Sequence, residues 1–413
     1  MKVFFRRIHL YLGLAAGLVI TISCLTGSLL VFEKELTEAF NHDRYYVQPA
    51  AQRLPLDEIA AMVKQQVPGA GVSRIQVFAD PSRTLAVSLD EKKKGGKKEV
   101  KGAAPAQNKV AGNKDVKAAE KNAPPKKEKG GRTAFVNPYT GKVVELYSYQ
   151  QTFYYKIFSL HRWLLAGDTG KMITGISTLI FVFILITGIV LWWPKTRNIL
   201  KQRIKVKWDR GWKRLNHDLH IVLGFYAAIF LFVSAFTGLT IGSEWFSKGL
   251  YAALGTSPKP TEAPVSVPDP VITHKTISFE TALAQVKQQV PDAQYYSLMA
   301  PKDTAAAFMV TLLPAGTLHE GATTSYYLDQ FSGKVLKSQT FGEKNLGQQI
   351  RSSVKPLHTG AIFGKTSKVF ALIIALLGVT FPTTGTILWI NRTMKKKKGP
   401  KAKSRITATA VAA

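Results

Sequence analysis

The chain has 413 residues, of which 46% are hydrophobic, and its formal net charge is +30. That surplus could indicate a nucleic-acid-binding protein, but residues 92–132 alone hold 14 basic and 4 acidic residues, and much of the remainder flanks long apolar runs. Basic residues at the ends of apolar runs are typical of membrane proteins, so we expect no nucleic-acid partner. Cys24 is the only cysteine, which excludes an internal disulfide framework and a cysteine-held iron–sulfur cluster.

Four apolar runs divide the chain, at about 8–32, 173–193, 217–242 and 369–390. Each is long enough to cross the hydrocarbon core of a bilayer, roughly 30 Å thick, as one helix. The first run could also be read as a secretory signal peptide, but no small-residue cleavage site follows it and its pattern recurs later in the chain. We therefore predict four retained membrane helices in contact with membrane lipid.

The basic residues predict the side on which each connecting segment lies. Three of the first seven residues are basic, residues 195–214 contain nine Lys or Arg against the single acid Asp209, and the tail carries four consecutive lysines from Lys395. The positive-inside rule places these segments in the cytoplasm. Both termini are then cytoplasmic, and the two long segments between the helices lie on the opposite side of the membrane.

The two long segments have the patterns of small α+β domains. In the first, residues 54–67 form an amphipathic helical pattern ended by Pro68, and strand-like runs follow at 74–78, 84–88 and 133–144. Residues 92–132 are rich in Lys, Gly, Ala and Pro, and we expect them to be a disordered insertion between two strands.

The expected fold class is membrane α-helical, with four transmembrane helices in two repeated halves and two small α+β external domains. In chain order we expect transmembrane helix 1 (1–33), external domain 1 (34–153) with its insert (92–132), an interfacial segment and transmembrane helix 2 (154–194), a basic cytoplasmic loop (195–216), transmembrane helix 3 (217–242), external domain 2 (243–353), an interfacial segment and transmembrane helix 4 (354–391), and a basic cytoplasmic tail (392–413).

The two halves match each other residue by residue. The N-terminal run and the run at 215–238 share a histidine, two glycines, a serine and a threonine at one constant offset, and the segments that begin LHRWLL and LHTGAI share a histidine, a glycine, a threonine and a lysine at another. The pairs are His9 with His220, Gly13 with Gly224, Ser23 with Ser234, Thr26 with Thr237, Gly27 with Gly238, His161 with His358, Gly167 with Gly364, Thr169 with Thr366, and Lys171 with Lys368.

Four of these matched residues are histidines that the predicted topology sorts by side. His9 and His220 lie at the cytoplasmic ends of their helices, and His161 and His358 lie at the outer ends. A pseudo-two-fold relation would bring the members of each pair face to face. Two imidazoles facing each other across a helical bundle are what a bis-histidine haem requires, with one axial ligand on each face of the ring.

Other interpretations of the histidines stay open at this point. A single interfacial histidine often only anchors a helix beside its basic neighbours, although ionisable residues at membrane helices are also candidates for function. A bare metal ion would need carboxylate or further histidine ligands, and no such group is apparent in the sequence. His217 lies three residues before His220 on nearly the same helical face, so it is either a supporting or propionate-binding group or the true ligand.

Small residues accompany the histidines. Gly13 and Gly224 lie one turn from His9 and His220 on the same face, where they would leave room for a flat macrocycle or would allow close helix packing. A Thr-Gly pair recurs in all four apolar runs, and we expect these pairs to serve helix packing. His42, His274 and His319 have no matched partner and are expected at the surface, whereas Glu33 and Glu244 match each other at the outer helix ends.

The assembled motifs resemble the PepSY-associated transmembrane-helix family. The resemblance rests on the R-x-x-H-x-x-x-G start, the LHRWLL and LHTG segments, and a VKQQVP helix followed by a Tyr/Phe-Thr/Ser-Gly-Lys-Val hairpin in each half, and it covers the chain except the Lys-rich insert and the tail. Members include iron-regulated inner-membrane proteins and haem-containing ferric-siderophore reductases. The resemblance implies that His9, His161, His220 and His358 are the ligands of haem iron.

The resulting hypothesis is a multi-pass protein of the bacterial inner membrane with two b-type haems, which reduces a ferric siderophore or another ferric chelate at periplasmic domains for iron acquisition. His161 and His358 would flank the reducing haem. No Gly-rich nucleotide fingerprint follows a strand, so the electrons would come from a quinol or a cytoplasmic reductase. The alternative is a non-redox protein whose anchored external domains bind a partner or regulate a peptidase.

Overall fold

Four long apolar helices form the membrane part of the protein, as the sequence predicts. The computed structural model describes residues 2–91, 131–258, 263–266 and 276–397. In this part of the chain the candidate spans are Lys2–Leu30, Gly167–Trp192, Trp212–Gly242 and Ala361–Met394. They correspond to α1 (Lys2–Leu30), α6 (Gly167–Trp192), the consecutive segments α8 (Trp212–Asp218), η2 (Leu219–Leu223) and α9 (Gly224–Gly242), and η3 (Ala361–Phe363) with α13 (Gly364–Lys397). The chain is therefore an integral membrane protein.

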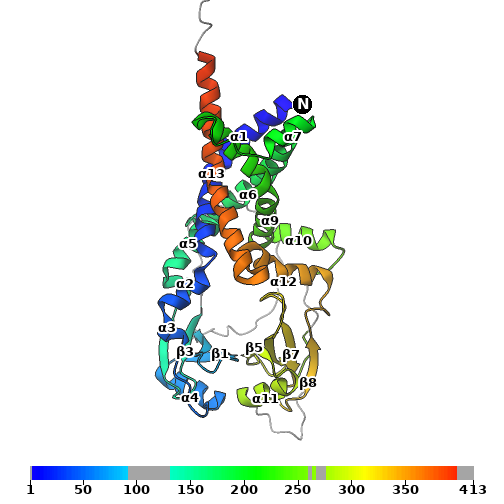
Figure 1. Cartoon of the computed structure of the whole chain (residues 1–413). Helices are drawn as coiled ribbons and strands as arrows, with labels where there is room; N and C mark the ends of the chain where they lie inside the picture. The colour runs from blue at the N-terminus through cyan, green and yellow to red at the C-terminus, as the bar shows by residue number, and fades with distance from the viewer. Residues whose placement is uncertain (1, 92–130, 259–262, 267–275, 398–413) are drawn as a thin grey trace, which may run out of the picture.

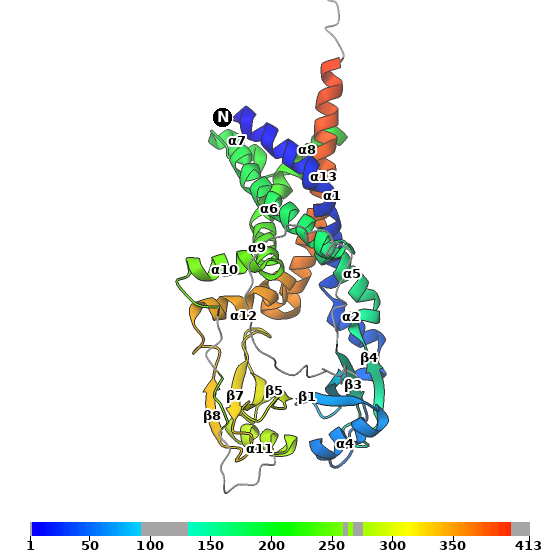
Figure 2. The same ribbon diagram turned by 180° about the vertical axis from the view of Figure 1, so that it is seen from behind.

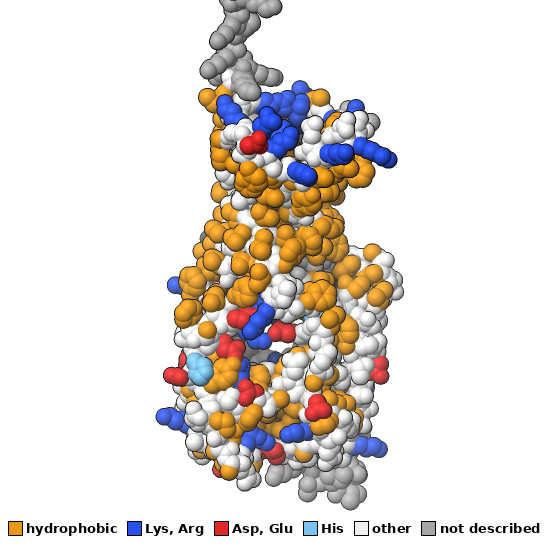
Figure 3. All heavy atoms as spheres, in the orientation of Figure 1, with side chains coloured by type: hydrophobic (Ala, Val, Ile, Leu, Met, Phe, Trp, Pro, Cys, Tyr) orange, Lys and Arg blue, Asp and Glu red, His pale blue; other side chains and the backbone are white. Residues whose placement is uncertain are grey.

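Two ends of this bundle can be distinguished. At one end lie the N-terminus, α7 (Arg197–Arg203) and the last turns of α13, and Lys and Arg side chains gather there (Figures 1 and 3). We call this the basic end. At the other, the sheet end, shorter helices lead to the part of the chain that lies outside the membrane bundle, which we call the external part (Figures 1 and 2). These are α2 (Glu33–Phe40), α3 (His42–Tyr45), the 3₁₀ turn η1 (Tyr149–Gln151), α5 (Phe153–Trp163), α10 (Glu244–Ala253) and α12 (Leu346–Thr359).

The bundle packs through small residues and exposes large apolar ones. Ala16, Ala227 and Ala228 are buried between the helices, where a small side chain lets two backbones approach closely. The exposed side chains on the outside of the bundle include Leu18 and Ile229, and Figure 3 shows the resulting apolar band between the two ends. This distribution fits a bundle whose outer surface is solvated by lipid.

In the described residues, the strands of the external part form one continuous antiparallel sheet of eight strands. The strand order is β4-β3-β2-β1-β5-β6-β7-β8, and the two halves join where β1 pairs with β5, with Ile75 opposite Leu298. The two predicted α+β domains therefore share one sheet, and the pairing of β1 with β5 removes two edge strands that would otherwise leave backbone groups unpaired. The strands are β1 (Ala70–Phe78), β2 (Leu85–Glu91), β3 (Arg132–Val136), β4 (Val143–Tyr147), β5 (Ala293–Met299), β6 (Phe308–Pro314), β7 (Thr324–Leu328) and β8 (Val335–Gln339).

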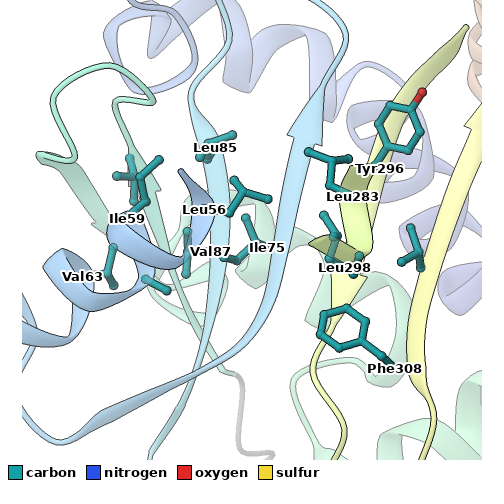
Figure 4. Packing of buried hydrophobic residues seen from close by; sticks show 14 of the residues in the cluster. Leu56, Ile59, Val63, Ile75, Leu85, Val87, Leu283, Tyr296, Leu298 and Phe308 are labelled. Atoms are coloured by element: carbon teal, nitrogen blue, oxygen red, sulfur yellow. The ribbon is translucent and has the colours of Figure 1, made fainter. Parts of the chain in front are cut away.

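Two helices, α4 (Leu56–Gln66) and α11 (Phe279–Gln289), cover one face of this sheet (Figures 1 and 2). Alternate strand residues point toward them and form a single core that runs across the junction of the two halves. Ile59, Ile75 and Leu298 are completely buried in it, and Figure 4 shows Phe308 next to Leu298. The core therefore unites the two halves into one folding unit.

The first turns of α4 and α11 cap each other. The Asp57 carboxylate accepts hydrogen bonds from the backbone N–H groups of Phe279 and Glu280 at 2.9 and 3.1 Å. Glu280 in turn accepts from the backbone N–H of Leu56 at 2.9 Å and from the Arg53 guanidinium at 2.7 Å. Each carboxylate thus satisfies donors that a helix N-terminus leaves without intrahelical partners.

Charged side chains of α2 link the sheet to the bundle. Lys368 of α13 is 8% exposed and donates to both carboxylate oxygens of Glu35 at 2.6 and 2.7 Å. Lys34 pairs with Glu320 at 2.8 Å, between the first half of the chain and the second. A buried ammonium needs such a partner, so Lys368 ties α2 to the membrane part.

Two boundaries differ from the predicted ones. The loop expected at 195–216 contains α7, and its last five residues already belong to the helix that continues as the third span. The second external segment contains α10 next to the bundle and the start of α12 before residue 354. The predicted insert lies outside the described residues except for its last two, of which Arg132 begins β3 and pairs with Leu89 of β2.

Candidate functional site

The first histidine pair lies toward the basic end of the bundle. His9 comes from α1 and His220 from the π-helical turn η2, and their ring centroids are 6.3 Å apart with the ring planes at 89°. The Nδ1 atom of His9 is 3.0 Å from the Thr187 hydroxyl, and the Nδ1 atom of His220 is 2.9 Å from the Thr384 hydroxyl. π-helical turns are often found at functional sites, because the extra residue reorients the side chains around it.

The second pair lies toward the sheet end and repeats this arrangement. His161 of α5 and His358 of α12 have ring centroids 6.1 Å apart and planes at 55°. The Nδ1 atoms bond to the hydroxyls of Thr26 and Thr237 at 3.1 and 3.0 Å. The structure therefore brings together the histidines that match in the sequence, and each ring receives a threonine from a neighbouring helix.

Backbone carbonyls complete the contacts of the Nδ1 atoms. Nδ1 of His161 lies 2.9 Å from the carbonyl oxygen of Ser23, and Nδ1 of His358 lies 3.0 Å from that of Ser234. In the other pair the backbone hydrogen bonds involve Ile184 and Phe381. In all four cases the backbone partner is three residues before the threonine.

These contacts assign the proton on each imidazole. A carbonyl oxygen can only accept, so Nδ1 carries the hydrogen and Nε2 keeps a lone pair available to a metal. The threonine oxygens can also accept, because each hydroxyl donates to a carbonyl of its own helix at 2.6–2.9 Å. An imidazole oriented through the nitrogen that does not bind the metal is the usual arrangement of a histidine ligand.

The glycine after each threonine makes room for the ring. A Cβ atom added at these glycines would lie 3.0–3.3 Å from the Cε1 atom of the facing histidine, which is tighter than ordinary van der Waals contact. The pairs are Gly27 with His161, Gly188 with His9, Gly238 with His358 and Gly385 with His220. The Thr-Gly pairs, which we expected only to pack helices, are therefore contacts of the four histidines. Their recurrence in all four spans was the sequence signal for this role.

The distance between the rings matches two imidazoles that share one metal atom. With metal–nitrogen bonds of about 2.0–2.1 Å and about 1.1 Å from each nitrogen to its ring centre, the centroids would be roughly 6.3 Å apart. The observed separations are 6.3 and 6.1 Å. Two imidazole rings that bind one metal atom from opposite sides can be rotated to any angle about the line that joins their nitrogen atoms. Neither of the two observed interplanar angles therefore opposes this arrangement.

A cavity of about 660 Å³ surrounds the His9–His220 pair. Gly13 and Gly224 both line it, and a Cβ atom at Gly13 would meet no heavy atom within 4 Å. Its walls are largely apolar, including Phe381 and Leu231. The volume and character are those of a small-molecule or cofactor site, which typically occupies about 300–1,000 Å³.

His217 is also a lining residue of this cavity. Its Nδ1 atom is 3.0 Å from a carboxylate oxygen of Asp218, which also accepts from Arg214 at 2.9 Å. Asp218 is 1% exposed and accepts as well from the backbone N–H of Lys207 at 3.1 Å. Of the two histidines that the sequence left open, His220 is the one whose ring pairs with that of His9, whereas His217 lines the cavity and pairs with Asp218.

The remaining candidates differ in surroundings. Glu33 is half-buried and hydrogen-bonded to Tyr149, and burial raises the pKa of its carboxyl, against the opposing effects of Tyr149 and Lys355. Glu244, its counterpart in the sequence, is an exposed residue paired with Lys248 at 2.8 Å. The two glutamates therefore have different environments, although their sequence positions match.

The three unmatched histidines have separate outcomes. The side chain of His42 is 69% exposed, as expected of a surface residue. His319 is only 7% exposed, which corrects the surface expectation: it contacts the Ser353 hydroxyl at 3.2 Å and accepts from the backbone N–H of Gly321 at 3.1 Å. His274 lies outside the described residues.

Comparison with known families agrees with the sequence motifs. The model of the PepSY-associated TM region matches residues 6–392, nearly the whole chain. The chain belongs to the PepSY-associated TM region family. A comparison with curated proteins gave no significant match. The match covers nearly all of the four membrane helices, the eight strands of the described residues and both histidine pairs, so the membrane bundle and the external sheet together make up the family's region in this chain.

Proposed function

We propose that the protein holds two b-type haems, one between His9 and His220 and one between His161 and His358, and transfers electrons across the membrane to a ferric chelate. The observation that carries this proposal is the double occurrence of two imidazoles facing each other about 6 Å apart, each oriented through Nδ1. A structural histidine has no need of a second imidazole at that distance. Four such histidines in two pairs fit bis-histidine ligation.

The donor set favours haem over a bare ion. In the described residues there is no group of three or more His, Cys, Asp or Glu that could hold a metal ion. A porphyrin supplies four equatorial nitrogens itself, so two protein ligands complete the coordination of its iron. The cavity around His9 and His220 is large enough for a macrocycle, and Gly13 and Gly224 leave its walls smooth.

Haem bound at these positions would supply reversible one-electron transfer. The chain's own residues set the conditions for it: the threonine and carbonyl contacts fix each imidazole, and the apolar walls keep water away from the iron ligands. Along α1, His9 and Thr26, which holds His161, are seventeen residues apart, so the two pairs lie about 25 Å apart along the helix axis. The two sites thus serve the two sides of the membrane.

The charges and the family support a substrate on the sheet side. The basic loop at 195–214 favours a cytoplasmic basic end, and this would leave the sheet end on the periplasmic side of a bacterial inner membrane. Ferric-siderophore reductases belong to the family that the motifs resemble, and ferrous iron is held less tightly than ferric iron by hard oxygen donors. Reduction at the sheet end would therefore release iron from its chelate. The donor would be a quinol or a cytoplasmic reductase.

Haem content tests the proposal directly. Protein purified from haem-replete cells should show the absorption bands of a reducible low-spin haem, with two haems per chain. Because each haem needs both of its ligands, His9→Ala and His220→Ala should each remove the same half of the haem, and His161→Ala and His358→Ala should each remove the other half. His217→Ala should retain both. Colourless wild-type protein would favour the non-redox alternative, in which the external sheet binds a partner or regulates a peptidase.

The substrate needs a second measurement. In sealed vesicles with the chain in one orientation and a reductant on the basic side, a ferric hydroxamate chelate on the sheet side should yield ferrous iron, detected with a ferrous trap. The same chelate supplied only on the basic side should remain ferric. Haem-containing protein that reduces neither would leave the cofactor assignment in place and contradict the substrate.

A further inference from the structure

The cavity around His9 and His220 is strongly asymmetric in charge. Four permanent cations line it, and its lining contains no Asp or Glu; the cations are Lys2, Arg6, Arg203 and Arg392. Most of the other lining residues are apolar, and His217 is near the same end. The cavity therefore has an apolar body within the bundle and a cationic end at the basic end of the membrane part.

Two of these cations already have backbone partners. Lys2 donates to the carbonyl of Trp193 at 3.1 Å, and Arg203 donates to the carbonyls of Leu191, at 3.1 Å, and Trp192. They satisfy the last carbonyls of α6, as basic groups near a helix C-terminus often do. Within the described part of the chain, Arg6 and Arg392 make no hydrogen bond or ion pair. These two guanidinium groups are free to bind something else.

Their position relative to the histidines is fixed by the helices. Arg6 precedes His9 by three residues, and Arg392 follows Gly385, the contact of His220, by seven. At 1.5 Å per residue these offsets are about 5 and about 10 Å along the helix axes, both toward the basic end. Two cations from two helices thus lie on one side of the imidazole pair and within reach of a cavity-bound molecule.

We propose that Arg6 and Arg392 bind the carboxylates of the molecule held between His9 and His220, and so fix its orientation with the carboxylates toward the basic end. The inference rests on the proposed function, in which this molecule is haem, whose two propionates are its only anionic groups. Arg pairs with carboxylates in a bidentate manner, which gives orientation as well as affinity. Apolar walls accept the ring, whereas the reversed orientation would bury both carboxylates among apolar side chains without a cationic partner.

The test compares haem with haem dimethyl ester, in which both carboxylates are masked. Full-length protein carrying His161→Ala and His358→Ala, prepared from haem-deficient cells, leaves only the His9–His220 site to be titrated. In phosphatidylcholine nanodiscs this protein should bind haem about tenfold more tightly than the ester, the ratio expected from two ion pairs of ordinary strength. The binding spectrum should be low-spin with both ligands, because the imidazoles are unchanged.

Variants then show which residues cause the preference for haem over the ester. Arg6→Gln with Arg392→Gln should bind haem and ester equally, whereas Arg6→Lys with Arg392→Lys should keep part of the preference, because lysine retains the charge but not the bidentate geometry. Arg197→Gln with Lys201→Gln is the matched control, since both residues are exposed at the same end and neither lines the cavity. If the control abolishes the preference, general surface charge is responsible and the site assignment is overturned.

Two further outcomes distinguish a failure of the arginine assignment from a failure of the haem assignment. Binding of neither haem nor ester would contradict the haem assignment itself. Equal binding of both by the parent protein would retain the haem assignment and overturn the role of the arginines, even if the glutamine variant failed to accumulate. Phosphatidylglycerol in the nanodiscs distinguishes a lipid headgroup: if it removes the preference for haem, the arginines bind lipid phosphate and the proposal fails.

Discussion

At the scale of single residues, the threonines decide how the histidines are presented. A neutral imidazole has two tautomers, and the hydrogen bond at one nitrogen selects which lone pair remains for a ligand. Here Thr26, Thr187, Thr237 and Thr384 all contact Nδ1, in partnership with a backbone carbonyl. The same selection in four places indicates one chemical requirement, which is a free Nε2 atom on each ring.

Thr384→Val tests this requirement, because valine keeps the shape of threonine and lacks the hydroxyl. With the contact to Nδ1 of His220 lost, we expect haem affinity at the His9–His220 site to fall by about tenfold or more, the range seen when partners of metal-binding histidines are removed. Haem titration and electron paramagnetic resonance of the low-spin signal measure the effect. Thr384→Ser should restore it. Thr380→Val, one turn away on α13, is the control, since the Thr380 hydroxyl donates to Leu377; an equal loss there would show a general effect on the helix.

At the scale of elements, different interactions stabilise the external sheet and the bundle. The sheet buries one apolar core beneath α4 and α11 and joins its halves through β1 and β5. The bundle relies on close approach of small residues, since lipid provides no hydrophobic driving force between helices. The reciprocal capping by Asp57 and Glu280 is a polar device within the sheet domain and lies at the junction of its halves.

Removal of either capping carboxylate should destabilise the external part. Asp57→Ala leaves the N–H groups of Phe279 and Glu280 without their acceptor, and Glu280→Ala does the same to Leu56, so each should cost about 0.5–2 kcal/mol. Thermal unfolding followed by limited proteolysis of the full-length protein measures the loss. Glu58→Ala is the matched control, because Glu58 is also in the first turn of α4 but is exposed. A comparable loss in that control would attribute the effect to the helix dipole alone.

The connection between β2 and β3 should tolerate replacement. These strands pair directly, with Leu89 opposite Arg132, so a short turn can join them. We expect the protein with a Gly-Ser turn in place of residues 92–130 to accumulate in the membrane and bind haem as the wild type does. Quantitative blotting of membranes and haem content check this. Loss of stable protein would show that the replaced residues support the fold.

At the scale of the whole molecule, charged contacts at the sheet end couple the bundle to the sheet. Lys368 binds Glu35, and Lys34 binds Glu320. Burial by itself would raise the pKa of the Glu320 carboxyl, but the Lys34 ammonium outweighs this effect, and the pKa is lowered. Glu33, next to them, has the opposite shift, because burial raises its pKa. Neighbouring carboxylates at one junction therefore respond to pH in opposite directions.

Glu33→Gln isolates one of these responses. A raised pKa means that the carboxyl of Glu33 holds its proton more tightly in the folded protein than in the unfolded chain. Glu33 therefore makes its full contribution to stability below the ordinary glutamate pKa. This contribution is lost as the pH rises through the higher pKa of the folded protein. The variant should therefore be more stable than wild type at pH 8, and this difference should shrink toward pH 4. Thermal unfolding across this range measures it. A constant difference would mean that Glu33 is not responsible for the pH dependence.

Features that depend on local pattern could be predicted from the amino-acid sequence alone. Apolar length predicted four spans, basic flanks marked one end of the bundle, and matched positions predicted which histidines pair, because these properties need only neighbours along the chain or one constant offset. The PepSY-associated family was also evident from local motifs.

Features that depend on contacts between residues far apart in the sequence could be seen only in the folded chain. The fusion of two predicted sheets at β1 and β5, the burial of His319 and the choice of His220 over His217 as the partner of His9 all needed the packed chain. The Thr-Gly pairs are the clearest case: in the sequence they match a common helix-packing pattern, and only the crossing of helices places each one against a histidine on another. A residue's own neighbours determine its helix, but the side chain it meets is set by the packing of the helices.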